Sequence, residues 1–110
     1  MVIMHYFLGF PPYRSGGLTK YVTDLMGEQL NQRLSVIGVW PGEMRVLNKK
    51  IEFREHKSVN GIRSIEIINP LPVPLDEGVR NTELFTRKAD KDVFIGFLSK
   101  TAPDVIHIHT

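Results

Sequence analysis

Two histidines near the end of the chain are the residues whose type and spacing could most directly do chemistry. His107 and His109 are separated by one residue in an apolar run, and side chains two apart lie on the same face of a strand. Such a pair could bind a metal ion, but no third ligand accompanies it in the sequence, so we expect no metal site. We expect His109, at the strand end, to meet a substrate and His107 to be an internal core histidine. His5 and His56 are expected to be structural.

Gly16 and Gly17 form the second candidate site. They stand between an expected strand and an expected helix, and the free N–H groups at a helix N-terminus bind anions. Without a Cβ, both residues let the backbone approach a phosphate closely. Arg14 and Lys20 would add positive charge nearby. The alternative, that the pair only makes a tight turn, stays open.

Two known phosphate-binding fingerprints do not occur at this junction. A dinucleotide site needs G-x-G-x-x-G directly after the first strand, and residues 9–17 do not contain it. A nucleoside triphosphatase loop needs a Lys after its last glycine, whereas Leu18 and Thr19 follow the glycine pair here. Both of these nucleotide-binding classes are therefore disfavoured.

The elements that must position these residues alternate between strands and helices. Residues 2–8 are a continuous apolar and aromatic run, typical of a central strand covered on both faces. Apolar residues spaced by three and four then predict a helix from about Gly17 to about Gln32, capped by Ser15 or Thr19. Residues 34–40 are strand-like again. This order predicts a right-handed βαβ unit.

The second half of the sequence predicts a hairpin, a connector and a final helix and strand. Asn60-Gly61 lies between two extended segments at 51–56 and 62–68, which indicates a tight hairpin turn. Three prolines in 69–74 indicate an extended connector. A short helical piece is expected at 82–88, a helix at 90–101 and a strand at 104–109. The fold class expected is α/β, a Rossmann-like parallel sheet core flanked by helices, with a β-hairpin insertion.

Length and composition limit the classes that remain. A chain of 110 residues forms one domain, and 42% hydrophobic residues are enough for one core. The absence of cysteine excludes disulfides, thiolate metal sites and cysteine nucleophiles. A net charge of only +2 fits a small phosphate-bearing ligand better than a nucleic acid. Residues 1–10 are too short to span a bilayer and lack the features of a signal peptide, so we expect a cytoplasmic protein.

Taken together, these segments resemble the N-terminal domain of family 4 glycosyltransferases, the retaining enzymes with the GT-B fold. The resemblance covers essentially the whole chain and is specific through the combination of its parts. The matching segments are Phe10-Pro11-Pro12, Gly16-Gly17-Leu18-Thr19-Lys20-Tyr21-Val22 and Pro103-Asp104-Val105-Ile106-His107-Ile108-His109.

The resemblance implies two Rossmann-like domains that face each other across a cleft. The N-terminal domain mainly holds the acceptor, and the C-terminal domain holds the nucleotide-sugar donor. Carried over to this sequence, Gly16 and Gly17 contact the donor diphosphate and His109 is the catalytic residue beside the transferred sugar. Tyr13 and Arg14 face the acceptor. No metal and no cofactor are expected.

The sequence departs from the family in two places. Gln32-Arg33-Leu34 replaces the usual Gly-His before the second strand, which affects only a turn. The donor domain, with its basic and paired-glutamate motif, is absent. We therefore expect residues 1–110 to be a single truncated GT-B N-terminal domain that does not turn over alone.

The partners expected from this resemblance are a nucleotide-sugar donor and a sugar or lipid-linked acceptor, with a peripheral membrane contact in the intact enzyme. No nucleic acid is expected. A sheet edge left without a neighbour predicts self-association. Two alternative functions stay open: a non-catalytic sugar- or phosphate-binding module, and an unrelated α/β domain such as half of a nucleotide-dependent oxidoreductase, which the missing fingerprint disfavours.

Overall fold

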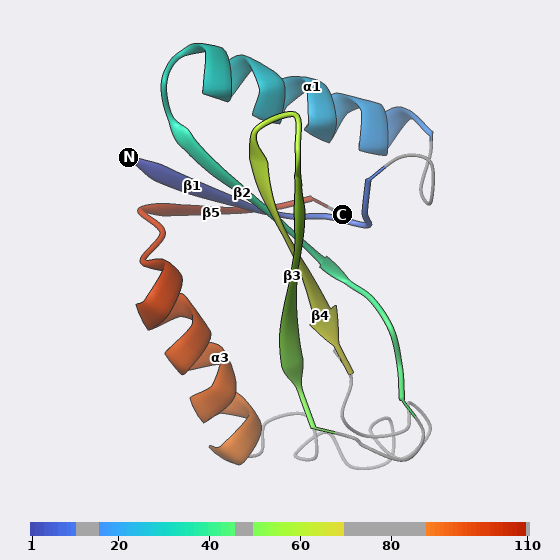
Figure 1. Cartoon of the computed structure of the whole chain (residues 1–110), viewed down its shortest axis with the longest axis vertical. Coiled ribbons are helices and arrows are strands. Elements are labelled where there is room, and N and C mark those ends of the chain that lie inside the picture. Colours follow the sequence, from blue (N-terminus) through green and yellow to red (C-terminus); the bar gives the residue numbers. More distant parts are fainter. Residues whose placement is uncertain (11–15, 46–49, 70–87, 110) are drawn as a thin grey trace.

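The fold is an α/β arrangement in which a mostly parallel sheet is flanked by helices (Figure 1). The structure is a computed structural model, and it describes residues 1–10, 16–45, 50–69 and 88–109. Residues 70–74 of the expected connector at 69–74, and most of the expected helical piece at 82–88, lie outside these residues. The elements in chain order are β1 (Val2–Tyr6), α1 (Gly17–Asn31), β2 (Ser35–Pro41), β3 (Glu52–Val59), β4 (Ile62–Ile68), α3 (Lys88–Thr101) and β5 (Val105–Ile108).

The five-stranded sheet has the order β3-β4-β2-β1-β5. β1 pairs in parallel with β2 and β5, and β2 pairs in parallel with β4. β1 therefore lies in the interior of the sheet, as its unbroken apolar sequence predicts. Only β3 is antiparallel to its neighbour. This architecture confirms the expected α/β class and is compatible with a Rossmann-like fold.

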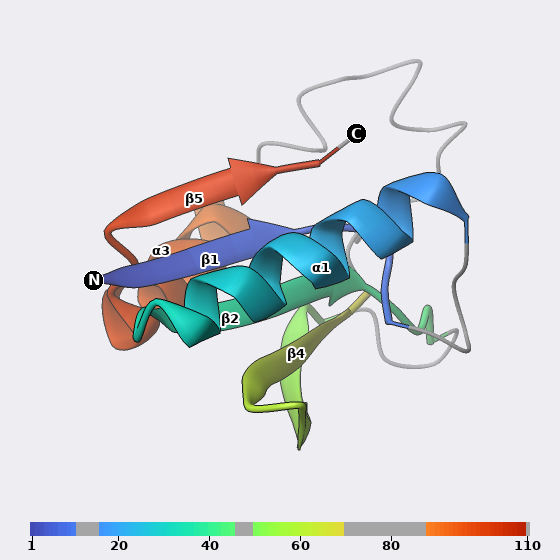
Figure 2. The same cartoon turned by 90° about the horizontal axis from the view of Figure 1, so that it is seen from above.

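α1 and α3 cover opposite faces of the sheet, as the view from above also shows (Figure 2). Successive residues of an extended chain point to opposite faces. Met4 of β1 lies on the α3 side, and Phe7, which follows β1, lies on the α1 side. On the α3 side Phe94, Phe97 and Leu98 pack against a buried cluster of Met4, Ile37, Val39, Ile51, Ile65 and Ile67. The cluster on the α1 side comprises Phe7, Phe10, Val22, Met26, Val36 and Ile62. Burial of each large side chain contributes about 1.5–3 kcal/mol.

The hairpin of β3 and β4 turns at Asn60 and Gly61, as predicted. Both residues have positive φ, 49° and 85°, which is the conformation of the tight turn that Asn-Gly favours. The hairpin is not a separate insertion, because β4 also pairs with β2 and extends the parallel sheet. That second pairing explains why residues 62–68 alternate poorly, since β4 is buried on both faces.

Helix α1 begins and ends close to the predicted residues. Its N-cap is Gly16, with φ 106° and no side-chain cap among the described residues, so the expected capping role of Thr19 is wrong; Thr19 is buried inside the helix. Ser15 lies outside the described residues. At the other end Arg33 adopts φ 63°. The amides of Arg33 and Leu34 donate to the carbonyls of Leu30 and Gln29, which is the Schellman ending usually made by glycine.

Candidate functional site

The carboxyl ends of β1 and β5 lie beside the N-terminal half of α1. Ligands of parallel α/β sheets bind at this edge, because the strand ends and helix N-termini converge there. His109 follows β5 directly, and its backbone N–H donates to the Tyr6 carbonyl at 2.9 Å. Tyr21, in the first turns of α1, approaches His109 with ring centroids 6.2 Å apart in an edge-on arrangement.

The pairing of β5 with β1 brings a third histidine to the predicted pair. Asp104 sets the register: its amide donates to the Val2 carbonyl at 2.8 Å, and its carboxylate accepts from the Val2 amide at 2.7 Å. Three residues further along, His107 lies opposite His5. The parallel register therefore places His5, His107 and His109 on one face of neighbouring strands.

These three imidazoles form a compact cluster. The ring centroids of His107 and His109 are 3.9 Å apart, and those of His5 lie 5.4 Å and 5.1 Å from them. Nδ1 of His5 lies 2.8 Å from Nε2 of His109, and Nε2 of His5 lies 2.7 Å from Oε1 of Gln29 on α1. His5 is thus a fully buried, hydrogen-bonded histidine, as expected.

The other two histidines were expected to differ in exposure, and the structure shows the opposite difference. His107 was expected to be a core histidine and is exposed, so that prediction is wrong; His109 was expected to lie furthest out and is only 8% exposed. The reason is tertiary. β5 is an edge strand, which leaves its middle uncovered, whereas the start of α1 covers the strand end through Tyr21.

The electrostatics of the cluster favour the uncharged form of His5 and of His109. Burial lowers the pKa of His5, with a smaller lowering from His107, against the hydrogen bond to Gln29, which raises it. Burial, followed by His107 and His5, lowers the pKa of His109. The Gln29 oxygen can only accept, so Nε2 of His5 carries its hydrogen and Nδ1 accepts one from Nε2 of His109. Nδ1 of His109 is then left as an acceptor.

The glycine pair lies at the start of α1, where the sequence predicted it. Gly17 is the first helical residue, and the Lys20 amide makes the first helical hydrogen bond, to Gly16. Among the described residues nothing lies within 4 Å of the position that a Cβ would take at either glycine. Lys20 pairs with Asp24 at 2.9 Å instead of pointing to the glycines. Tyr13 and Arg14 lie outside the described residues.

A pocket that sequence reasoning missed opens at the carboxyl ends of β1 and β2, beside the middle of β4. Its volume is about 550 Å³, and its walls include Phe10, Trp40, His56, Ser64 and Glu66. Trp40 lies opposite Glu66 in the parallel register, and its ring lies 5.4 Å from that of His56. The single tryptophan, Trp40, was the sequence feature that could have pointed to this pocket. Its neighbours, however, depend on a strand pairing that local sequence does not reveal.

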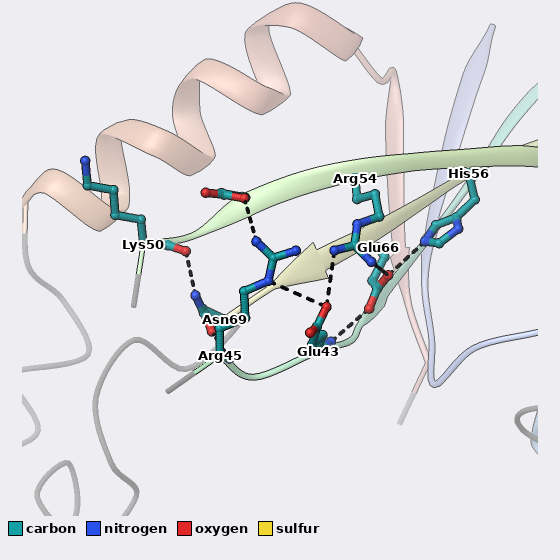
Figure 3. A network of polar contacts seen from close by, with 8 residues as sticks. Glu43, Arg45, Lys50, Arg54, His56, Glu66 and Asn69 are labelled. Carbon is teal, nitrogen blue, oxygen red and sulfur yellow. Dashed lines mark hydrogen bonds and ion pairs between the residues drawn. The ribbon is translucent and has the colours of Figure 1, made fainter. Parts of the chain in front are cut away.

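Charged side chains surround Glu66 at the rim of this pocket (Figure 3). Nε2 of His56 lies 2.8 Å from Oε1 of Glu66, and the Glu43 amide donates to the other carboxylate oxygen at 2.8 Å. Burial alone would raise the pKa of Glu66, but the hydrogen bonds from His56 and Glu43 and the charge of Arg54 hold it below its usual value. Glu66 is therefore ionised at neutral pH and can accept hydrogen bonds from a ligand.

No family model, curated protein or solved structure matches the chain. The function must therefore be argued from the geometry of the site. Within the described residues, no helix combines the length and the apolar character needed to cross a membrane.

Proposed function

We propose that the chain is the acceptor-side, N-terminal part of a GT-B glycosyltransferase, which moves a sugar from a nucleotide-sugar donor to a sugar or lipid-linked acceptor. One observation carries the proposal: Tyr21 contacts His109, so the glycine start of α1 and the histidine after β5 share one edge of the sheet. A donor needs both features together, because its phosphates and its sugar are joined by a single bond.

In this proposal the chain acts mainly through electrostatic stabilisation. The uncapped amides at Gly16 and Gly17 hold the diphosphate, whose negative charge grows as the glycosidic bond breaks. His109, fixed through Nε2 by His5, presents Nδ1 as a hydrogen-bond acceptor to a hydroxyl of the transferred sugar. Because the imidazole is already held by that bond, little reorganisation is needed when the sugar binds.

The pocket at Trp40 is the acceptor site in this proposal. The indole offers an apolar ring face to the C–H groups of a sugar, and the ionised Glu66 accepts hydrogen bonds from its hydroxyls. Apolar walls with a few polar groups are typical of small-molecule sites, and about 550 Å³ is within their usual size.

A non-catalytic carbohydrate-binding module is the second candidate function. The same pocket favours it, because Trp40, His56 and Glu66 could hold a sugar without any donor. The two functions differ in what Gly17 does, since only the glycosyltransferase uses the start of α1.

The test is a titration of the chain with UDP-glucose and GDP-mannose, followed by NMR chemical shifts in the presence of EDTA. We expect shifts at Gly16, Gly17 and Tyr21, and a loss of affinity of about tenfold or more, about 1.4 kcal/mol, in Gly17→Val. The fold should tolerate this change, because a Cβ at Gly17 meets nothing within 4 Å among the described residues. Gly27→Val, in equally open space on α1, is the matched control and should keep the affinity.

Three results would count against the proposal. Equal affinity in Gly17→Val and Gly27→Val would show that the helix start does not hold the phosphates. Binding of simple sugars at Trp40, with no binding of either nucleotide sugar, would favour the non-catalytic module. Tighter binding of a nicotinamide dinucleotide would point to an oxidoreductase.

A further inference from the structure

The cluster of His5, His107 and His109 has the composition of a metal site. One ring nitrogen from each histidine lies within 4.8 Å of the other two. We propose that these three residues bind a zinc ion between β1 and β5. The proposal does not rest on the glycosyltransferase function, because it needs only the register of the two strands.

The distances fit zinc after small side-chain movements. Zn–N bonds of about 2.0–2.1 Å put the nitrogens of a tetrahedral site about 3.3 Å apart. Nδ1 of His5 and Nε2 of His109 are 2.8 Å apart, so this pair opens by about half an ångström. The nitrogen of His107 lies within 4.8 Å of the other two, so it must approach them by up to about 1.5 Å. The His107 side chain is exposed, so this movement does not require the core to rearrange.

Gln29 orients the buried ligand. Its Oε1 accepts the Nε2 hydrogen of His5 at 2.7 Å, which leaves the lone pair of Nδ1 directed at His109. A ligating histidine usually donates its second N–H to an oxygen in this way, which holds the ring and selects the tautomer. Zinc would replace the hydrogen now shared between Nδ1 of His5 and Nε2 of His109, and that hydrogen would move to Nδ1 of His109.

The donor set selects the kind of ion. Three neutral imidazoles suit zinc and the neighbouring transition metals, whereas Mg²⁺ and Ca²⁺ require oxygen ligands. The cluster supplies three ligands among the described residues, so a tetrahedral ion would take water or an anionic oxygen as its fourth ligand. Three protein ligands with one open position form the arrangement of reactive zinc sites, in contrast to closed structural ones.

The experiment is calorimetric titration of the metal-free chain, prepared without a histidine tag, with zinc chloride. We expect one zinc ion per chain with a dissociation constant of about 1 μM or lower. Mg²⁺ should give no binding. Co²⁺ in place of zinc should show the strong visible absorption of a tetrahedral ion.

The variants compare one proposed ligand with His56, the one histidine of the chain outside the cluster. His107→Ala should weaken zinc binding at least about tenfold while leaving the circular dichroism spectrum unchanged, because the side chain is exposed. His56→Ala, at the remaining histidine, is the control and should keep the affinity. Gln29→Ala should weaken binding by about 10- to 100-fold through loss of the orienting hydrogen bond.

Some results would overturn the inference. These are the absence of binding by the folded chain, an affinity unchanged in His107→Ala, or an equal loss in His56→Ala. Because the nucleotide-sugar titration is performed with EDTA present, its failure and the failure of zinc binding are separate outcomes.

Discussion

At the scale of single residues, the molecule is most unusual at His5. Its ring is fully buried and uses both nitrogens, one toward Gln29 and one toward His109. Since the Gln29 oxygen only accepts, this chain of contacts defines the tautomers of His5 and His109. These two histidines therefore form one hydrogen-bonded unit, and protonation of either disturbs the other.

This unit predicts a loss of stability on acidification. The pKa values of His5 and His109 are lower in the folded chain than the ordinary 6.5, so the unfolded chain takes up protons first. The stabilisation is therefore fully present above pH 6.5 and is lost as the pH falls through the two folded-state pKa values. Urea unfolding with EDTA, from about pH 7.5 to about pH 5, should show a steadily falling free energy of unfolding.

The variant His109→Gln separates this effect from other titrations. Glutamine can still donate to His5 but does not titrate, so its unfolding free energy should vary less with pH. The carboxylates with lowered pKa values, Glu55 and Glu66, have an ordinary pKa of 4.5 and contribute at lower pH. A slope unchanged in His109→Gln would contradict the assignment.

At the scale of elements, α1 has two positions where the residue type does not suit the backbone conformation. Its C-terminal turn needs a residue with positive φ, and Arg33 supplies it at 63° where glycine is usual. Its interior contains Gly27, where a Cβ would meet nothing within 4 Å among the described residues. The helix therefore carries a Cβ where one is strained and lacks one where it is favoured.

Placing glycine at position 33 and alanine at position 27 should stabilise the protein. Arg33→Gly relieves the positive φ, and Gly27→Ala reduces the entropy of the unfolded chain, so each should raise the unfolding free energy by about 0.5–1 kcal/mol. The two effects should add, because the sites share no contact. Urea unfolding of the single and double variants measures this.

The matched control is a glycine with positive φ. Gly61 lies in the hairpin turn at φ 85°, so Gly61→Ala should lower the unfolding free energy by about 1 kcal/mol. A gain in Gly61→Ala, or a loss in Gly27→Ala, would show that φ does not decide these effects.

At the scale of the whole molecule, the β5 edge of the sheet exposes a row of apolar side chains. Among the described strands β5 has a partner on one side only, and the open side of such an edge strand can pair with another strand. Its residues Val105, Ile106 and Ile108 are 44%, 46% and 63% exposed. Ile106 and Ile108 border an apolar hollow of about 240 Å³ lined by α3 residues such as Phe94 and Phe97.

This edge predicts self-association of the chain. Light scattering after size-exclusion chromatography should show dimers or larger species that increase with concentration. Ile108→Lys should shift the population toward the monomer, because burying an unpaired charge at the interface is costly. Met44→Lys, at an equally exposed residue beyond β2, should leave the population unchanged. A monomer at high concentration would contradict the prediction.

Much of the fold was predictable because its signals are local. Residues 18–30 repeat with the helical period, Asn60-Gly61 favours one kind of turn, and the apolar run at 2–8 indicates a buried strand. The strand at 62–68 was harder to interpret, because its second neighbour, β2, is specified elsewhere in the chain. The exposure of the β5 side chains was also hard to predict from local sequence. The β5 sequence is typical of an apolar strand, and only its place at the sheet edge leaves it uncovered.

For the candidate site, the sequence by itself determined that His107 and His109 share a face and that Gly16 and Gly17 begin a helix. Only the tertiary structure decided that His5 joins the two histidines and that Trp40 lies beside Glu66. The physical reason is the parallel register, which joins residues far apart in the chain. The Asp104 contacts with Val2 hold one such register, and a shift by one residue would turn both histidines to the other face.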